Sequence, residues 1–506
     1  METDASMKHG PTRFTSTSIY QIRGVAKESG SRRAVGAVQK AYRSPLTYVI
    51  VGLIGLFAHI LWSEELYTFF HRFLAWVLLV LFLSIAYKFV NTAKKEVPII
   101  PLVFFHFYML YGFAQFTQSE ISLFIGVYTP REDTLNTAML LVVGAELAFL
   151  VGTWAGKSTG WKSKLSIWKK LPLPTQRWMT GVILYGIGSL LVMVFVLSNI
   201  PIEIRRIVAV FFNPHLGLIL LLFLAFRTGS RVLLAVALIS SGGLIAYGLS
   251  IGMLEWIIVT IYIWSVASWI WGSRFRLRWL VLALLIFFIL NPAKYLYRSG
   301  EALGGSVLEQ WGNAIALTWF GESKKAAIER GLARTSNLIH FSQCIEWVPE
   351  IVPFNKGEGF EKVFMYYIPR FFWRDKPGIS ELINNKWAIA FYVSTPEGVE
   401  KSTFGISQPL DGFWDFGILG SMLYPFGFGF LLGLLFLGPG RANDSVKLMG
   451  LLLTSEFFQI LGPLQNFFVS LLSLSVGAWV VFLVMRLLFR SSRGYNWATF
   501  FYRKGA

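Results

Sequence analysis

Long apolar runs separated by short polar connections recur along most of the chain. A helix of about 20 residues is long enough to cross the hydrocarbon core of a bilayer. The pattern predicts an all-α, polytopic integral membrane protein with about 12 transmembrane helices. We place these spans at 46–62, 69–90, 98–116, 137–155, 178–198, 207–226, 231–248, 250–271, 279–291, 413–437, 448–465 and 466–488.

One long polar segment, residues 292–412, interrupts this pattern between the ninth and tenth predicted spans. It predicts a large external helical insert in a single membrane domain. We expect a basic cytoplasmic tail at 1–45, nine spans within 46–291, the external insert at 292–412, three spans within 413–488 and a second basic cytoplasmic tail at 489–506.

The positions of Lys and Arg predict the orientation, because cytoplasmic connections of membrane proteins carry an excess of these residues. If the N-terminus is cytoplasmic, the connections expected inside include Lys94, Lys95 and the lysine-rich segment 157–177, whereas connections expected outside carry residues such as Glu64 and Glu65. The N-terminal tail is polar and lacks the apolar core of a signal peptide. We therefore predict that both termini are cytoplasmic and that the insert is external.

Composition agrees with a membrane protein. The chain is 55% hydrophobic and only 15% charged, with a mean hydropathy of +0.56. The net charge of +18 is explained by basic cytoplasmic connections, so we expect no nucleic-acid partner. Cys344 is the one cysteine, and no two histidines stand at a metal-ligand spacing. These features predict neither an intrachain disulfide nor a bound metal or other cofactor.

The stretch Tyr366–Pro377 is the strongest candidate for a site in the insert. It places Arg370, Arg374 and Lys376 among aromatic residues and two prolines. Prolines favour an irregular, rigid backbone, and closely spaced cations can bind phosphate oxygens. The alternative is an interfacial loop whose cations reach toward lipid headgroups.

Further cations are expected outside the membrane. Arg298 follows the ninth predicted span, and Arg330 and Arg334 share one face of a helix predicted from Ser323 to Val348. Arg205 and Arg206 stand at the outer end of the sixth span, where cations are disfavoured and therefore suggest function. Each pair suits a diphosphate, but membrane anchoring or a solvated helix face would also explain them.

Two residues are candidates for the base that accepts a proton. Asp411 directly precedes the tenth predicted span, where a carboxylate can act as a base or can cap the start of the helix. His340 lies on the predicted helix 323–348, beside the arginine face. A single histidine of this kind is either a base or an ordinary helix residue.

Several motifs in the insert resemble a known family. They are Arg334, the pair Pro353 and Gly357, the sequence Ile368-Pro369-Arg370-x-x-Trp373-x-x-Lys376-Pro377, and Phe416-Gly417-x-x-Gly420. In this order they resemble oligosaccharide repeat-unit polymerases of the O-antigen polymerase type, which are related to O-antigen ligases. The resemblance is specific over residues 290–425. Arg374 departs from it, because many members have proline there.

This resemblance implies a metal-independent glycosyltransferase at the outer face of the bacterial inner membrane. Its substrate would be an oligosaccharide linked to undecaprenyl diphosphate, and its partners could include a chain-length regulator and a flippase. Arg298, Arg330, Arg334, Arg370 and Lys376 would stabilise the leaving diphosphate, with Arg205 and Arg206 lining the same cavity, and Asp411 and His340 would serve the acceptor hydroxyl. The alternatives are a glycan ligase with the same donor, and a transporter or flippase of lipid-linked sugars.

Overall fold

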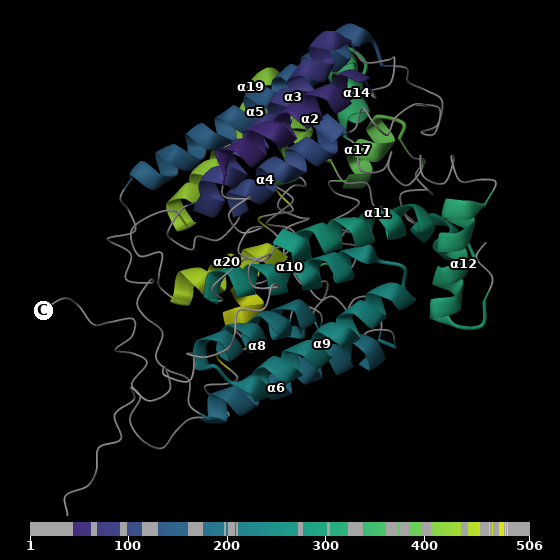
Figure 1. The fold of residues 1–506 in the computed structure, drawn as a ribbon. Helices are drawn as coiled ribbons and strands as arrows, with labels where there is room; N and C mark the ends of the chain where they lie inside the picture. Colours follow the sequence, from purple (N-terminus) through teal and green to yellow (C-terminus); the bar gives the residue numbers. More distant parts are fainter. Residues whose placement is uncertain are drawn as a thin grey trace, which may run out of the picture. The chain divides into compact units, whose positions relative to one another are not determined.

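The computed structural model describes residues 44–61, 68–91, 99–113, 130–159, 176–196, 211–271, 277–300, 304–321, 337–360, 384–393, 406–436 and 444–455, with a few further positions. The chain divides into two compact units, Met1–Val51 and Gly52–Ala506. All regular elements in the described ranges are helical (Figure 1). The first helix, α2, spans Pro45–Leu61, and its residues up to Val51 belong to the first unit.

Six helices are long and apolar enough to cross a membrane, which indicates a membrane protein. They span Phe69–Asn91, Glu132–Ser158, Met179–Val196, Arg231–Ser250, Leu254–Trp271 and Gln408–Leu434. Shorter apolar helices occupy Pro45–Leu61, Ile99–Gly112 and Pro214–Thr228. These nine coincide with predicted spans, but the predicted total of about 12 is not confirmed. Most of the last predicted span, 466–488, lies outside the described residues.

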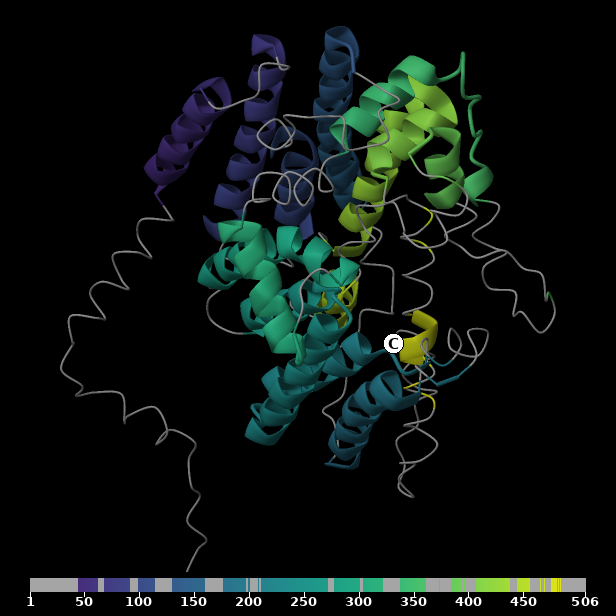
Figure 2. The same ribbon diagram turned by 90° about the vertical axis from the view of Figure 1, so that its right-hand side faces the viewer.

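One group of helices packs around a large aromatic core. Its members are α3 (Phe69–Asn91), α4 (Ile99–Phe107), the π-helix η2 (Tyr108–Gly112), α5 (Glu132–Ser158), α14 (Leu338–Trp347), α17 (Asn384–Ala390) and α19 (Gln408–Phe436). At its centre the ring of Phe149 contacts that of Phe104 edge-on and that of Phe428 at a tilt, with ring centroids 5.9 Å apart in each pair. Figure 2 shows the green α14 beside the yellow-green α19.

Glycines bring α5 and α19 into backbone contact. A Cβ added at Gly152 or Gly156 would lie 2.1 Å from the carbonyl oxygen of Phe426 or Phe430, and Gly429 and Gly433 approach α5 equally closely. Paired G-x-x-x-G sequences allow such close approach between membrane helices. Because later residues of α5 contact later residues of α19, the two helices run parallel, consistent with the prediction that both begin on the same side of the membrane.

A second group packs around α8 (Pro214–Thr228), whose residues from Leu216 to Ala225 are all buried. Asn213 caps its start by accepting hydrogen bonds from the amides of His215 and Leu216, and Gly229, with φ of 70°, ends it. Its neighbours are α6 (Gln176–Leu191), α9 (Arg231–Ser250), α10 (Leu254–Trp271) and α20 (Asp444–Ser455).

The ninth predicted span differs from the structure at its end. Helix α11 runs from Leu277 to Ser299 and continues through Pro292, where we expected it to stop. Proline removes one helical hydrogen bond, but Ala293 and Leu296 just beyond it are buried against α10 and α12 (Val307–Phe320). Tertiary packing therefore extends the helix into the region predicted as the start of the insert.

Candidate functional site

A break in α19 organises the candidate site. Phe416 and Gly417 have non-helical backbone angles, and Gly417 combines φ of 63° with ψ of −148°, a conformation that is essentially restricted to glycine. Gly412 before the break and Gly420 after it lie in close backbone contact: a Cβ added to either would lie about 2 Å from the other's carbonyl oxygen. The sequence Phe416-Gly417-x-x-Gly420 therefore makes a tight helical corner.

Asp415 is buried at this corner and accepts three hydrogen bonds. Its Oδ1 accepts from Nδ2 of Asn355 at 2.7 Å and from the backbone amide of Gly357 at 3.0 Å, and its Oδ2 accepts from the hydroxyl of Tyr424. The first two donors belong to the turn 353–359 and the third to the helix after the break. Asp415 thus joins the turn 353–359 to the parts of α19 before and after the break.

The turn 353–359 is held against α19 by further contacts. The amide of Asn355 donates to the carbonyl oxygen of Trp414 at 3.0 Å, and the indole of Trp414 donates to that of Pro353 at 3.2 Å. Lys356 and Gly357 have positive φ values of 54° and 76°, as a tight turn requires. Two motifs of the family resemblance, Pro353 with Gly357 and Phe416-Gly417-x-x-Gly420, therefore meet in space.

Lys386 of α17 connects this buried network to solvent. Its Nζ donates to Oδ1 of Asn355 at 2.8 Å and to Oε2 of Glu358 at 2.6 Å, and it lies 5.8 Å from the ring centroid of Trp414. Asn355 therefore bridges a partly exposed ammonium group and the buried carboxylate of Asp415. This arrangement offsets the cost of burying the Asp415 charge without a direct ion pair.

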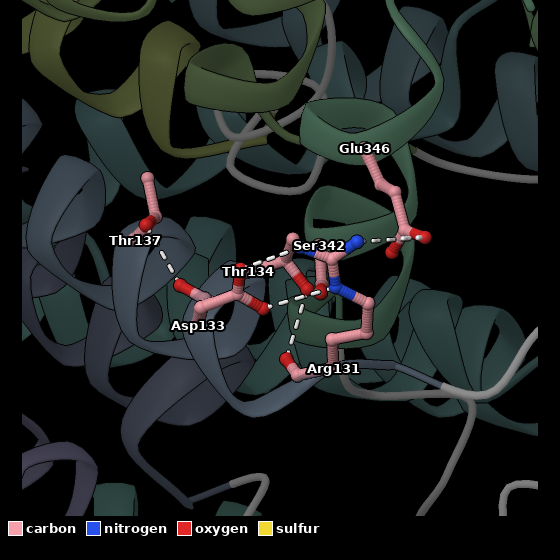
Figure 3. A network of polar contacts seen from close by, with 6 residues as sticks. All are labelled: Arg131, Asp133, Thr134, Thr137, Ser342 and Glu346. Carbon is pink, nitrogen blue, oxygen red and sulfur yellow. Dashed lines mark hydrogen bonds and ion pairs between the residues drawn. The ribbon is translucent and has the colours of Figure 1, made fainter.

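Polar contacts also fix α14 against α5 and η2. The hydroxyl of Ser342 donates to that of Thr134 at 2.7 Å, and Thr134 donates to the carbonyl oxygen of Arg131 at 2.9 Å. Arg131 forms an exposed ion pair with Asp133 at 2.6 Å and reaches toward Glu346 at 4.0 Å (Figure 3). The network locates α14 at the N-terminal end of α5.

Asp411, a predicted base, lies in the first turn of α19 and is buried. Its backbone amide donates to the carbonyl oxygen of Ser407 at 2.9 Å, so the residue is already helical and does not cap the helix start. Burial, followed by the charges of Asp411 and Asp415, raises the pKa of the Cys344 thiol. The negative charges of both carboxylates are therefore felt at the same position of α14, Cys344.

Ser407, the residue directly before α19, is also buried, and its hydroxyl is hydrogen-bonded to that of Tyr111 in η2.

His340, the second predicted base, lies on α14 one turn before Cys344. Its ring meets the Trp387 ring edge to face, with centroids 5.1 Å apart. Burial lowers the pKa of His340 to about 4, so the imidazole is neutral near pH 7 and able to accept a proton only in acid. The described helix begins at Leu338, whereas the earlier part of the predicted helix 323–348 lies outside the described residues.

Arg298 is the predicted cation that the structure describes. It is exposed in the last turn of α11, and its Cγ would lie 2.9 Å from a Cβ added at Gly252. Helix α11 packs on α10 and α12, and the described contacts do not bring Arg298 beside Asp411 or His340. The other predicted cations lie outside the described residues: Arg205, Arg206, Arg330, Arg334, Arg370 and Lys376.

Sequence reasoning missed the residues that hold the site together, namely Asp415, Asn355, Tyr424 and Lys386. A local signal existed for one of them, because Asp415 follows Asp411 by one helical turn and therefore shares its face. No local pattern marks Asn355 as the partner of Asp415, or Lys386 as the partner of Asn355. Their roles depend on contacts between segments that are about 30 to 60 residues apart.

Comparison with known proteins gives one match. No curated protein and no solved structure matches the chain. One family model matches residues 99–492, a range that contains both the turn 353–359 and the corner of α19. The chain therefore belongs to this family, which is described as a domain of unknown function (DUF8712).

Proposed function

We propose that the protein is a membrane glycosyltransferase that polymerises oligosaccharide repeat units carried on undecaprenyl diphosphate. The reaction takes place at the outer face of the bacterial inner membrane, with both termini of the chain in the cytoplasm. The observation that supports this proposal most is the meeting of two motifs of the family resemblance at the corner of α19. Asp411 lies one helical turn before Asp415, the residue that joins these motifs.

The proposed chemistry assigns the acceptor side of the reaction to Asp411. Its carboxylate takes the proton of an acceptor hydroxyl while that oxygen attacks the anomeric carbon of the donor glycan. The bond from that carbon to the diphosphate breaks, and undecaprenyl diphosphate leaves with the bonding electrons. Arg370 and Lys376, with other cations of the insert, stabilise the charge of the leaving group without a metal ion. Because Asp411 is buried, the structure around the first turn of α19 must open before an acceptor hydroxyl can reach it.

The direct test is to give the purified protein a glycan on a polyprenyl diphosphate in detergent, without divalent metal. We expect longer glycans and free carrier diphosphate. Asp411→Asn should lower the rate by about 10² to 10⁴, as for loss of a general base, whereas Asp133→Asn should not, because Asp133 is exposed. Full activity in Asp411→Asn would exclude Asp411 as the base, and unchanged substrate with the wild-type protein would contradict the proposed reaction.

Topology provides a second test. In a Cys344→Ser background, a cysteine placed at the exposed position Glu358 should react with an impermeant thiol reagent in intact cells, and one at Lys164 should not. The opposite result would place the corner of α19 in the cytoplasm. That location has no access to a glycan exposed at the outer face, so the proposed function would fail with it.

A transporter of lipid-linked sugars is the second candidate function. It is favoured by the broken helix α19 and by Glu146, a carboxyl group buried within a membrane-spanning helix, because both features occur at transport sites. A transporter makes no bond, so it would return the lipid-linked glycan unchanged in detergent and move it across sealed vesicles. A ligase would instead transfer the same donor only when its own acceptor is supplied.

A further inference from the structure

Glu146 is a buried acid that the proposed glycosyl transfer does not use. It lies in the middle of α5, its side chain is fully buried, and neither carboxyl oxygen has a hydrogen-bond partner. An ionised carboxylate in such a place would lose its hydration without compensation, which strongly disfavours the charged form. The group is therefore expected to carry a proton.

The surroundings of Glu146 reinforce this expectation. Val142 and Phe149, which share its face of α5, are fully buried in the aromatic core. The buried titratable groups on the helices that pack against α5 are His71 on α3, His106 on α4, His340 and Cys344 on α14, and Asp411, Asp415 and Tyr424 on α19. None of them is hydrogen-bonded or ion-paired to Glu146.

The glycine contacts of α5 and α19 follow Glu146 along the helix. Thr153 is two turns after Glu146, and its Oγ1 is a further buried atom without a hydrogen-bond partner. This oxygen would lie 3.0 Å from a Cβ added at Gly429, so the face of α5 that carries both polar groups is pressed against α19. Separation of the two helices would expose this face to water.

We propose that Glu146 is a proton-binding site inside the membrane, closed by the packing of α5 on α19. The carboxyl group holds its proton while the helices are in contact. When they part, the O–H bond breaks and the proton passes to water. Proton release is thereby coupled to separation of the two helices. This inference is independent of the proposed glycosyl transfer, because protonation is measured without substrate.

Infrared difference spectroscopy of the purified full-length protein in lipid nanodiscs at pH 7 tests the proposal. Subtracting the spectrum of Glu146→Gln from that of the wild type should reveal the carbonyl stretch of a protonated carboxyl group. The matched control is Glu132→Gln, which removes an exposed carboxylate from the first turn of the same helix and should not reveal this band. Glu146→Met provides the same subtraction if the glutamine variant does not fold.

Hydrogen exchange tests the closure. On transfer to D₂O, the band should shift slowly, because exchange waits for α5 and α19 to part, and it should shift faster in Gly429→Ala. An immediate shift in the wild type would show a water-filled site and overturn the closure. Absence of the band would overturn the proposal itself. A carboxylate band that responds to replacing Na⁺ by K⁺ would show a bound metal cation instead of a proton.

Discussion

Removing the carboxylate of Asp415 should open the corner of α19. Asp415→Ala leaves three buried donors without their acceptor: Nδ2 of Asn355, the amide of Gly357 and the hydroxyl of Tyr424. Hydrogen bonds to a charged group contribute about 1.5–3 kcal/mol each, but their loss is not additive, and the variant no longer has to bury a charge. Disruption of such a buried network typically costs about 3–5 kcal/mol.

Cys344 supplies the assay, because it is the one cysteine of the chain and is buried on α14 against the same core. A thiol-reactive dye can label it only when this core opens. When reclosing is faster than labelling, the labelling rate follows the open population. A loss of about 3–5 kcal/mol then corresponds to labelling that is faster by a factor of about 10² to about 4 × 10³.

The matched control is Glu358→Ala, which removes the exposed end of the same network. Its ion pair with Lys386 joins side chains that are 51% and 38% exposed, so its loss should change the labelling rate by no more than about fivefold. If Asp415→Ala also labels within about fivefold of the wild type, the three hydrogen bonds do not hold the corner closed. Other contacts would then have to hold α19 in its bent form.

Three further predictions concern other parts of the chain. Arg370→Lys should lose about a hundredfold in glycan polymerisation at matched membrane levels, while Arg374→Lys should be milder; wild-type polymer length in the first variant would assign that stretch to membrane anchoring. Gly429→Val should raise the Cys344 labelling rate strongly, because its side chain would clash with the backbone of α5, whereas Gly427→Val, at a position with open space, should label like the wild type. Because the pKa of His340 falls from 6.5 to about 4 on folding, the protein should lose stability as the pH falls from about 6.5 to 4. In His340→Gln, the part of the pH dependence of Cys344 labelling that comes from this loss should be missing.

The positions of the spans could be predicted because a long apolar run is a local property of the sequence. The prediction 69–90 corresponds to α3 at Phe69–Asn91, and 231–248 corresponds to α9 at Arg231–Ser250. The end of α11 could not be predicted in this way, because Pro292 is a local stop signal that burial of Leu296 overrides. Hydropathy also does not show that α19 breaks at Gly417.

The sequence indicates candidate residues of the site but not how the site is built. Asp411 was identified from its position before a span, and the structure places it beside the corner of α19. The residue that builds this corner is Asp415, and its importance rests on Asn355 and Tyr424, which reach it only in the folded chain. The sequence indicates His340 by its residue type and by its place on the predicted helix 323–348, whereas the burial that keeps it neutral is a property of the fold.

The length of α5 sets a limit on the depth at which this corner could lie in a bilayer. Its 27 residues extend about 40 Å at 1.5 Å per residue, whereas the hydrocarbon core is about 30 Å thick. In the proposed orientation, the charged N-terminal end of α5, with Arg131 and Asp133, would accommodate the excess by extending into the headgroup layer, and α14 is fixed to that end. In the proposed reaction, a lipid-linked donor could therefore present its diphosphate at this level while its polyprenyl tail remains among the acyl chains, so transfer would require no extraction of the lipid from the bilayer.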